Sequence, residues 1–423
     1  MTLDRSKAPE FKIPQNITLT HPNKLTLKNG INLYFIHTPH IDAVKLEVIT
    51  EANKHLLPSG KALVPFFTLH MLLEGTKTMG SAEIDSFFDH YASEVNVISG
   101  FEQSGMSLLT TKKHFMEVLP VFRSLFTEAV FPEKELAKRK SQKELTISIQ
   151  REETGARANQ LYRKALFGKE HPYGFVGEEV DVQNVFRQDL VDFYQTSLMV
   201  NPEIYITGNL SDAQVEAIAK NFEDLTVLDM EGTLPDYDIY PERRIAENRD
   251  KAVQSSLRLG QHLISKTHPD YHALTVFNTI LGGYFGSRLI KNIREDKGHT
   301  YGIYSSIGSL RLSDYWIVMA DVQKGNADLV IDEVYTEIDK LQQHHVGTDE
   351  LETVRNYMIG HFLSSFSSAF DLISRFKNVN QAGLSFDFYD EQLAFIRQFT
   401  ADDVQKVAQR YFNKNGILEV VVG

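Results

Sequence analysis

Apolar and polar residues alternate along the first half of the chain in a pattern that predicts strands followed by helices. Residues 23–37, NKLTLKNGINLYFIH, hold an Asn-Gly turn between two β-rich runs, which is typical of a hairpin. Residues 43–50, AVKLEVIT, continue with strand-like alternation. Residues 81–95 then place apolar side chains at helical spacing, and residues 205–209, YITGN, predict a closing strand. This order predicts an α+β unit whose sheet is covered on one face by helices.

The same plan returns in the second half. Residues 62–75, ALVPFFTLHMLLEG, and residues 273–283, ALTVFNTILGG, are apolar runs that close on glycine, and they start 211 positions apart. Two charged helix starts, residues 130–143 and 345–358, match in the same way. A single repeat of half the chain length indicates a duplicated domain rather than a solenoid. We therefore predict two homologous domains, each a mainly antiparallel sheet covered by helices, related by a pseudo-twofold axis.

The division between these domains is expected where the periodicity stops. Residues 227–244, VLDMEGTLPDYDIYPERR, lack a helical or strand period and contain one Gly and two Pro. We predict an N-terminal domain at 1–225, a linker at 226–244 and a C-terminal domain at 245–423. A length of 423 residues is too great for one ordinary core and fits this division.

Composition excludes several classes of protein. The net charge of −12 argues against nucleic acid as a partner, and no apolar run is long enough to predict a membrane span. The chain has no cysteine, so any metal would have to be held by histidines and carboxylates. The first residues, MTLDRSKAPEFKIPQ, do not read as a signal peptide, so a cytoplasmic location is expected, with a periplasmic one left open.

Four segments in one order carry a resemblance to a known family. They are residues 70–85 (HMLLEGTKTMGSAEID), 168–174 (GKEHPYG), 205–209 (YITGN) and 281–306 (LGGYFGSRLIKNIREDKGHTYGIYSS). Together they make the chain resemble the insulinase/pitrilysin-like zinc peptidases, the inverted zincins that include the mitochondrial processing peptidase. The resemblance covers nearly the whole chain and implies two domains facing one another across a clamshell-like cavity.

The zinc motif of that family is degenerate in this sequence. The family's H-x-x-E-H motif puts two histidines on one helix face to hold Zn²⁺, with a glutamate between them as general base. In register with HMLLEGT, His70 takes the second histidine position, Phe66 the first and Leu69 that of the base. The resemblance thus implies that His70 is a remnant ligand and that no catalytic residue is intact.

The family's distant zinc ligand is also missing. The glutamate that should complete the site falls on Thr146 or Ile147, and its companion falls on Arg139 or Lys140. The basic run at 138–140 is expected to be a solvated helix face. We expect no bound metal in this chain, with zinc carried only by an active partner.

The second-domain segment, in contrast, keeps the family's substrate-binding pair. An arginine and a tyrosine spaced like Arg294 and Tyr301 reach the bound peptide in the family. A guanidinium fork and a phenol O–H suit a backbone carbonyl or a developing oxyanion. The alternative reading is that Arg294 pairs with a nearby acid and Tyr301 packs within a strand.

These observations favour a non-catalytic, peptide-binding partner subunit of a two-component zinc endopeptidase. The chain would bind an unfolded peptide in its cavity and form a homodimer or a heterodimer with an active homologue. Two alternatives stay open. One is a structural or assembly subunit without a peptidase role, and the other is a stand-alone zinc metalloendopeptidase with displaced ligands.

Overall fold

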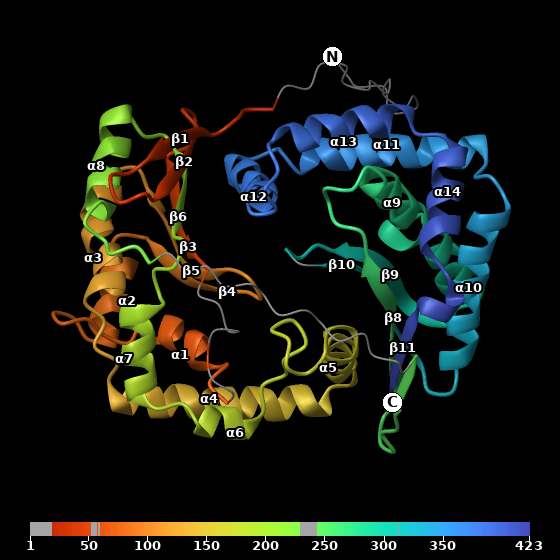
Figure 1. The fold of residues 1–423 in the computed structure, drawn as a ribbon, viewed down its shortest axis with the longest axis horizontal. Coiled ribbons are helices and arrows are strands. Elements are labelled where there is room, and N and C mark those ends of the chain that lie inside the picture. Colours follow the sequence, from red (N-terminus) through yellow and green to blue (C-terminus); the bar gives the residue numbers. More distant parts are fainter. Residues whose placement is uncertain (1–18, 52–56, 58–59, 229–242, 312) are drawn as a thin grey trace, which may run out of the picture.

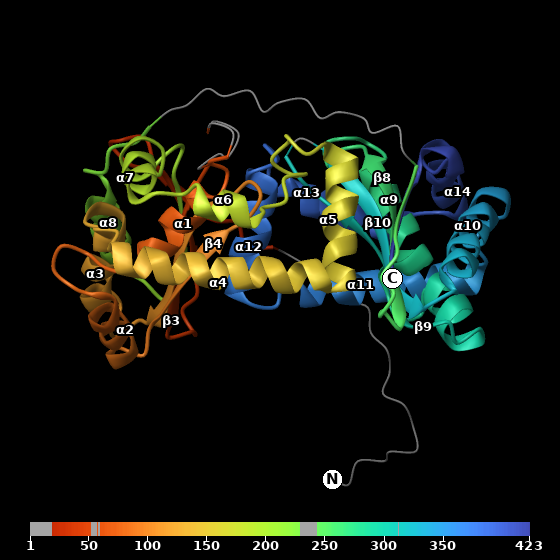
Figure 2. The same cartoon turned by 90° about the horizontal axis from the view of Figure 1, so that it is seen from below.

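The computed structural model describes residues 19–51, 57, 60–228, 243–311 and 313–423. Most of the linker predicted at 226–244 therefore lies outside the described residues. Two halves, each a sheet backed by helices, face one another, and a long helix runs from the first half to the second (Figures 1 and 2). Among the described residues no helix is both long and apolar enough to cross a membrane.

The first half builds a six-stranded sheet in the order β1-β2-β6-β3-β5-β4. All neighbours are antiparallel except β2 and β6, which are parallel. The strands are β1 (Asn23–Thr26), β2 (Asn32–His37), β3 (Ala43–Thr50), β4 (Glu94–Ser99), β5 (Ser104–Thr111) and β6 (Glu203–Gly208). The Asn-Gly hairpin and the closing strand predicted from the sequence are thus present.

Helices cover one face of this sheet and bury a large apolar core. Phe67 and Leu69 of the first helix and Phe122 of the third lie in that core with no solvent exposure. The helices are α1 (Val64–Met71), α2 (Ser81–His90), α3 (Phe115–Thr127), α4 (Glu133–Glu152), α5 (Thr154–Phe167), α6 (Glu179–Gln183), α7 (Arg187–Thr196) and α8 (Asp212–Phe222).

The second half repeats the plan with a five-stranded sheet in the order β7-β11-β8-β10-β9. Only β7 and β11 are parallel, as β2 and β6 are in the first sheet. The strands are β7 (Arg244–Glu247), β8 (Gln254–Leu263), β9 (Thr300–Gly308), β10 (Asp314–Gln323) and β11 (Leu418–Val422). Pairing β3 with β8, β5 with β10, β4 with β9 and β6 with β11 superimposes the two orders, so the predicted α+β duplication is confirmed.

The helices of the second half follow the same logic. The helix α9 follows β8 as α1 follows β3, so the two apolar runs 211 positions apart occupy equivalent places. The helical segments are α9 (Tyr271–Asn278), η2 (Thr279–Gly283), η3 (Ile290–Asp296), α10 (Ala327–Gln343), α11 (Thr348–Ser364), α12 (Ala369–Asn380), α13 (Asp387–Gln398), α14 (Ala401–Tyr411) and η4 (Lys414–Gly416).

Each half lends one helix to the other half's sheet. On β10, Trp316 and Val318 enter the core formed with the second half's own helices, whereas the alternating Ile317 packs with α5. The Tyr162 hydroxyl of α5 donates to the carbonyl of Trp316 at 2.9 Å, and Gly260 of β8 leaves the space for that ring. The sheet is therefore buried on both faces, and α5, from residues before the linker, covers the second one.

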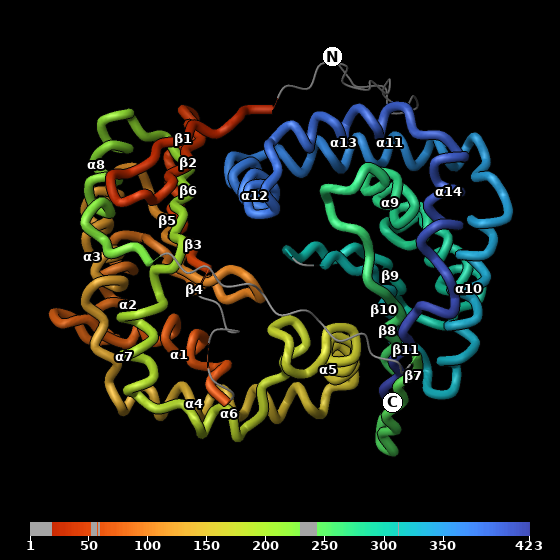
Figure 3. Tube along the Cα trace, viewed as in Figure 1, coloured from red at the N-terminus to blue at the C-terminus, as the bar shows by residue number. Residues whose placement is uncertain are grey.

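The helix α12 makes the reciprocal contact with the first sheet. Ile373 packs with Tyr34 and Tyr205, on the face opposite the first half's own helices. Lys377 Nζ lies 2.7 Å from Glu47 Oε2 of β3. The tube in Figure 3 shows α12 beside the first sheet and α5 beside the second. The domain bounds 1–225 and 245–423 stay a prediction of where the repeat divides, and the packing crosses that division in both directions.

Glu47 is the most buried charge in this exchange. Its residue is 4 % exposed, and Lys45 Nζ also lies 2.7 Å from its carboxylate. Burial alone would raise its pKa, but Lys377 and Lys45 outweigh burial and hold the pKa below its usual range. A depressed pKa stabilises the folded state above the unfolded pKa, and this stabilisation is lost as the pH falls.

We predict that Lys377→Met lowers the free energy of unfolding at neutral pH by up to about 3 kcal/mol, because it leaves Glu47 with Lys45 alone. The variant should also lose less further stability than the wild type when the pH is lowered below about 5. Lys406→Met is the matched control, since Lys406 pairs with Asp402 on the exposed side of α14 and should have little effect. Urea unfolding at two pH values checks this, and equal effects of the two substitutions would contradict it.

Candidate functional site

The short helix α1 carries the three positions of the degenerate zinc motif. Pro65 lies in its first turn, where a missing N–H costs nothing, and the helix packs against β4 and α4. Leu69 faces the core and is fully buried, whereas Phe66 and His70 are only partly buried. The position of the general base therefore holds an apolar side chain in the core.

His70 is held as a neutral imidazole. Its Nδ1 lies 2.8 Å from the carbonyl oxygen of Phe66, which can only accept, so Nδ1 carries the proton and Nε2 keeps a lone pair. Its ring lies 4.1 Å from the ring of Phe66. Burial, and then the nearby cations Arg139 and Lys143, lower the pKa of His70. The imidazole can accept one hydrogen bond, but it stands alone as a ligand.

Two cations of α4 lie close to the zinc-motif positions: Arg139, at the expected place of the companion glutamate, and Lys143, one helical turn before the expected place of the distant ligand. Lys143 Nζ sits 4.1 Å from the centre of the Phe66 ring, and burial lowers its pKa. Arg139 Nε donates to Glu74 Oε1 at 2.6 Å. Glu74 is 3 % exposed and also accepts from the Ser81 hydroxyl at 3.0 Å, so its oxygens are already used. The expectation that residues 138–140 form a solvated face is therefore wrong for Arg139.

The two candidates for the distant ligand offer nothing to a metal either. The Thr146 hydroxyl donates to the Gln142 carbonyl at 2.9 Å, and Ile147 is buried in the core. A single imidazole is too few ligands to hold a divalent ion, and the two cations beside it would repel the ion. These residues do not fit a zinc site. The sequence analysis did not predict that Lys143 lies near this site. Its position one helical turn before Thr146 and Ile147 is the signal that could have placed it there.

A group of three possible metal ligands occurs elsewhere among the described residues. It consists of His21, Asp387 and Asp390, all exposed, on the segment before β1 and on α13. Among the described residues no such group lies on α1 or α4. Exposed acidic groups of this kind are common without an ion, so this group does not replace the lost site.

Arg294 and Tyr301 are placed by η3 and β9, which pack against one another. The Arg294 guanidinium lies 5.0 Å from the centre of the Phe285 ring and pairs with no described carboxylate. Tyr301 is 92 % exposed and Phe285 is 64 % exposed. The structure does not support the alternative interpretation of this pair. Arg294 has no acidic partner among the described residues, and the Tyr301 side chain is exposed rather than packed.

Glycines fix the backbone around this pair. Gly298, between η3 and β9, has a φ of +65°, which few residues other than glycine adopt. A Cβ on Gly282 of η2 would come within 2.8 Å of the backbone nitrogen of Ser305, so only glycine allows η2 to lie this close to β9. The segments η2 and η3 are both π-helical, a geometry that often marks functional sites.

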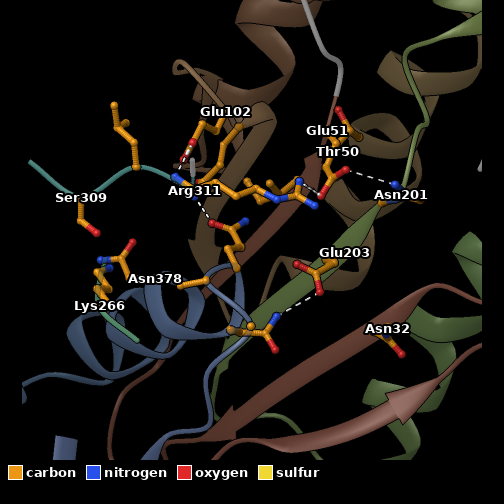
Figure 4. A pocket seen from close by; sticks show the side chains of 18 of the residues that line it. Asn32, Thr50, Glu51, Glu102, Asn201, Glu203, Lys266, Ser309, Arg311 and Asn378 are labelled. Carbon is orange, nitrogen blue, oxygen red and sulfur yellow. Dashed lines mark hydrogen bonds and ion pairs between the residues drawn. The ribbon is translucent and has the colours of Figure 1, made fainter. Parts of the chain in front are cut away.

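A third feature is the cavity that the family resemblance implies, although no motif predicted which residues line it. A cavity of about 970 Å³ lies between the two halves and is lined mainly by polar side chains. Figure 4 shows Lys266 and Ser309 on one side of it, Thr50, Glu51 and Asn201 on the other, and Arg311 between them. Arg311 Nη1 pairs with Glu51 at 2.6 Å, so the β9–β10 hairpin of the second half is tied to β3 of the first. The residues that line the cavity come from segments far apart in the chain, so no contiguous motif could identify them.

Comparisons with known proteins agree with this geometry. Residues 184–358 match the family described as the peptidase M16 inactive domain. The chain is 25 % identical over 359 residues to the uncharacterized zinc protease YmxG of Bacillus subtilis (strain 168), covering 83 % of this chain and 86 % of that protein. It is 26 % identical over 249 residues to the probable inactive metalloprotease YmfF of the same organism, covering 57 % of each.

A solved structure with a similar fold is the peptidase M16 inactive domain from Pseudomonas fluorescens. It matches with a TM-score of 0.87 and 21 % identity, covering 96 % of this chain and 98 % of that one. At this identity the likeness shows the fold alone. Residues 184–358 thus resemble the peptidase M16 inactive domain, and the fold is that of M16-like structures, so the family resemblance inferred from the sequence is confirmed. The degenerate zinc helix agrees with the relative that is named as probably inactive.

We predict that the purified protein contains well under one zinc per chain and does not cleave unstructured peptides alone. Activation of water needs a metal with an open coordination position and a base beside it. Leu69 stands at the position of the base, and its side chain can neither bind a metal nor accept a proton. Elemental analysis and a peptide cleavage assay with and without a chelator check this. Stoichiometric zinc together with chelator-sensitive cleavage that disappears in His70→Ala would refute it.

Restoring the motif on α1 should not create activity. In Phe66→His with Leu69→Glu, the new glutamate enters a fully buried position, and Lys143 and Arg139 remain beside the new histidine. We expect no gain in zinc and a loss of stability, because the distant ligand is still missing at Thr146 and Ile147. Metal content and thermal unfolding measure both. Phe66→His alone is the control, since that position is partly exposed and the stability loss should be smaller.

Proposed function

We propose that the protein is the non-catalytic, peptide-binding subunit of a two-component zinc endopeptidase. It would form a homodimer or a heterodimer with an active, zinc-bearing homologue, and would do so in the cytoplasm. Zinc and the attacking water would come from the active partner. This chain would supply donors that hold the peptide.

The observation that carries the proposal is the contrast between the two sites. On α1, Phe66 takes the position of a metal ligand and Leu69 that of the general base, and Lys143 of α4 lies against the Phe66 ring, where it would repel a cation. On η3 and β9, Tyr301 is almost fully exposed, and Arg294 is partly exposed against the Phe285 ring without a described acidic partner.

The edge of the second sheet offers the peptide a place to lie. The strand β9 pairs with β10 and with no other described strand, and Asn278 already donates to its carbonyl at Ser305, so the part of the edge near Tyr301 is the place for a peptide. An extended peptide can add to such an edge through main-chain hydrogen bonds. Tyr301, at the start of β9, would then donate its O–H to a peptide carbonyl, and the Arg294 guanidinium would lie beside it.

The decisive experiment mixes this chain with its zinc-bearing partner and follows cleavage of an unstructured peptide. We expect Arg294→Ala and Tyr301→Phe each to lower the rate of the complex by about 10²–10³, the usual cost of removing one preorganised donor to a developing oxyanion. Assembly of the complex, measured by gel filtration, should be unchanged. The rate should fall without any change in zinc content, because neither residue touches metal.

Tyr304→Phe is the matched control, since it removes a phenol O–H from the same strand at a position that is 51 % exposed. It should leave the rate within about twofold of the wild type. If Arg294→Ala and Tyr301→Phe also leave the rate unchanged, the pair is structural in this protein. The structural or assembly subunit then becomes the better description.

A further inference from the structure

The cavity between the two halves holds two opposite charges that do not meet. Asp314, the first residue of β10, is 1 % exposed, and its Oδ2 has no hydrogen-bond partner. Its Oδ1 accepts from the Ser309 hydroxyl at 2.9 Å and from the Leu310 N–H at 3.0 Å. Lys266, on the loop after β8, lines the same cavity and makes no hydrogen bond or ion pair with a described residue. The carboxylate and the ammonium therefore lie beyond ion-pair distance of one another.

Burial penalises both of these charges. It raises the pKa of Asp314 and lowers the pKa of Lys266, and each group partly offsets the shift of the other. A buried polar atom without a partner costs free energy until something satisfies it. The group that satisfies both must accept a hydrogen bond from an ammonium and donate one to a carboxylate. The cavity wall also carries Glu51, Glu102, Glu203 and Arg311, so its carboxylates outnumber its cations and it does not favour a group with negative charge.

The rest of the cavity wall narrows the chemistry further. Seven side-chain amides line it: Asn29, Asn32, Gln103, Asn201, Asn378, Asn380 and Gln381. Each amide carries both donors and an acceptor, the same pair of functions as a peptide group. Gln103 bonds to Gln381 across the halves, and the amides of Asn29, Asn201 and Asn380 donate to neighbouring oxygens. Asn378 bonds to no described residue. No aromatic ring occurs among the described residues that line the cavity, so it offers no face on which a ring could stack.

We propose that this cavity binds the main chain of an extended peptide, with one peptide group held between Lys266 and Asp314. The carbonyl oxygen accepts from the Lys266 ammonium, and the N–H donates to Asp314 Oδ2. The site recognises the backbone and not the side chains, because it has amides in place of aromatic or apolar pockets. The proposal rests on the peptide-binding function above and names a second contact for the same peptide, apart from Arg294 and Tyr301. The volume of about 970 Å³ exceeds what one peptide group needs and leaves room for neighbouring residues.

The test measures binding of a capped, unstructured glycine-serine peptide to the isolated full-length protein by calorimetry or NMR titration. Lys266→Met and Asp314→Asn should each weaken binding about 10- to 100-fold, since each removes one charge-assisted hydrogen bond. Asn at position 314 can still accept from Ser309 and Leu310, so the fold should be kept. The same peptide with its amides N-methylated has no N–H to donate. It should bind the wild type weakly and be insensitive to Asp314→Asn.

Lys220→Met, on the exposed face of α8, is the control and should bind the capped peptide as the wild type does. Equal affinity of the wild type, Lys266→Met and Asp314→Asn would overturn the main-chain site while leaving the partner-subunit function standing. Absence of any binding to the wild type would also overturn it. If these two variants lose binding but Arg294→Ala and Tyr301→Phe do not slow the partner, the main-chain site stands and the partner-subunit function fails.

Discussion

Glu47, buried on β3 of the first sheet, is kept charged by Lys377, which lies on a helix that the second half of the chain contributes. The equivalent helix of the first half, α5, packs on the second sheet through Tyr162 and its neighbours. Each sheet is apolar on both faces, so neither can be covered by its own half alone. Because α12 packs on the first sheet and α5 packs on the second, these two helices hold the sheets apart. The polar cavity lies in the space that remains between the halves.

The arrangement also limits what the clamshell can do. Opening it would strip α12 from the first sheet and α5 from the second, and would expose the apolar faces and the charge of Glu47. Arg311 adds a further tie at the tip of the β9–β10 hairpin, through Glu51. A fixed chamber suits a protein that presents binding groups, since preorganised donors lose less freedom when they bind.

The replacement at the zinc helix is more than the loss of ligands. A metal site gathers neutral imidazoles and carboxylates around a cation, whereas this chain gathers Lys143 and Arg139 around a neutral His70. Glu74, the carboxylate close by, accepts hydrogen bonds from Arg139 and Ser81, so its oxygens are not available to a metal. The side chains around His70 thus carry positive charge where a zinc site carries negative charge. The Phe66 ring and the Lys143 ammonium lie against one another here, so no metal is needed to offset a cluster of carboxylates.

The sequence by itself determined the duplication, the order of strands and helices, and the loss of the zinc motif. Hydrophobic periodicity is a local property, and the two apolar runs 211 positions apart carry it independently of their surroundings. The residues Phe66, Leu69, Arg294 and Tyr301 could be assigned because they lie within contiguous motifs. Tertiary structure alone decided the helix exchange, the ion pair of Glu74 with Arg139, and the placement of Lys266 and Asp314 in the wall of one cavity. The contacts of Glu74 with Arg139 and of Glu47 with Lys377 join residues 65 and 330 positions apart, and no local pattern records which distant side chains will share a buried space.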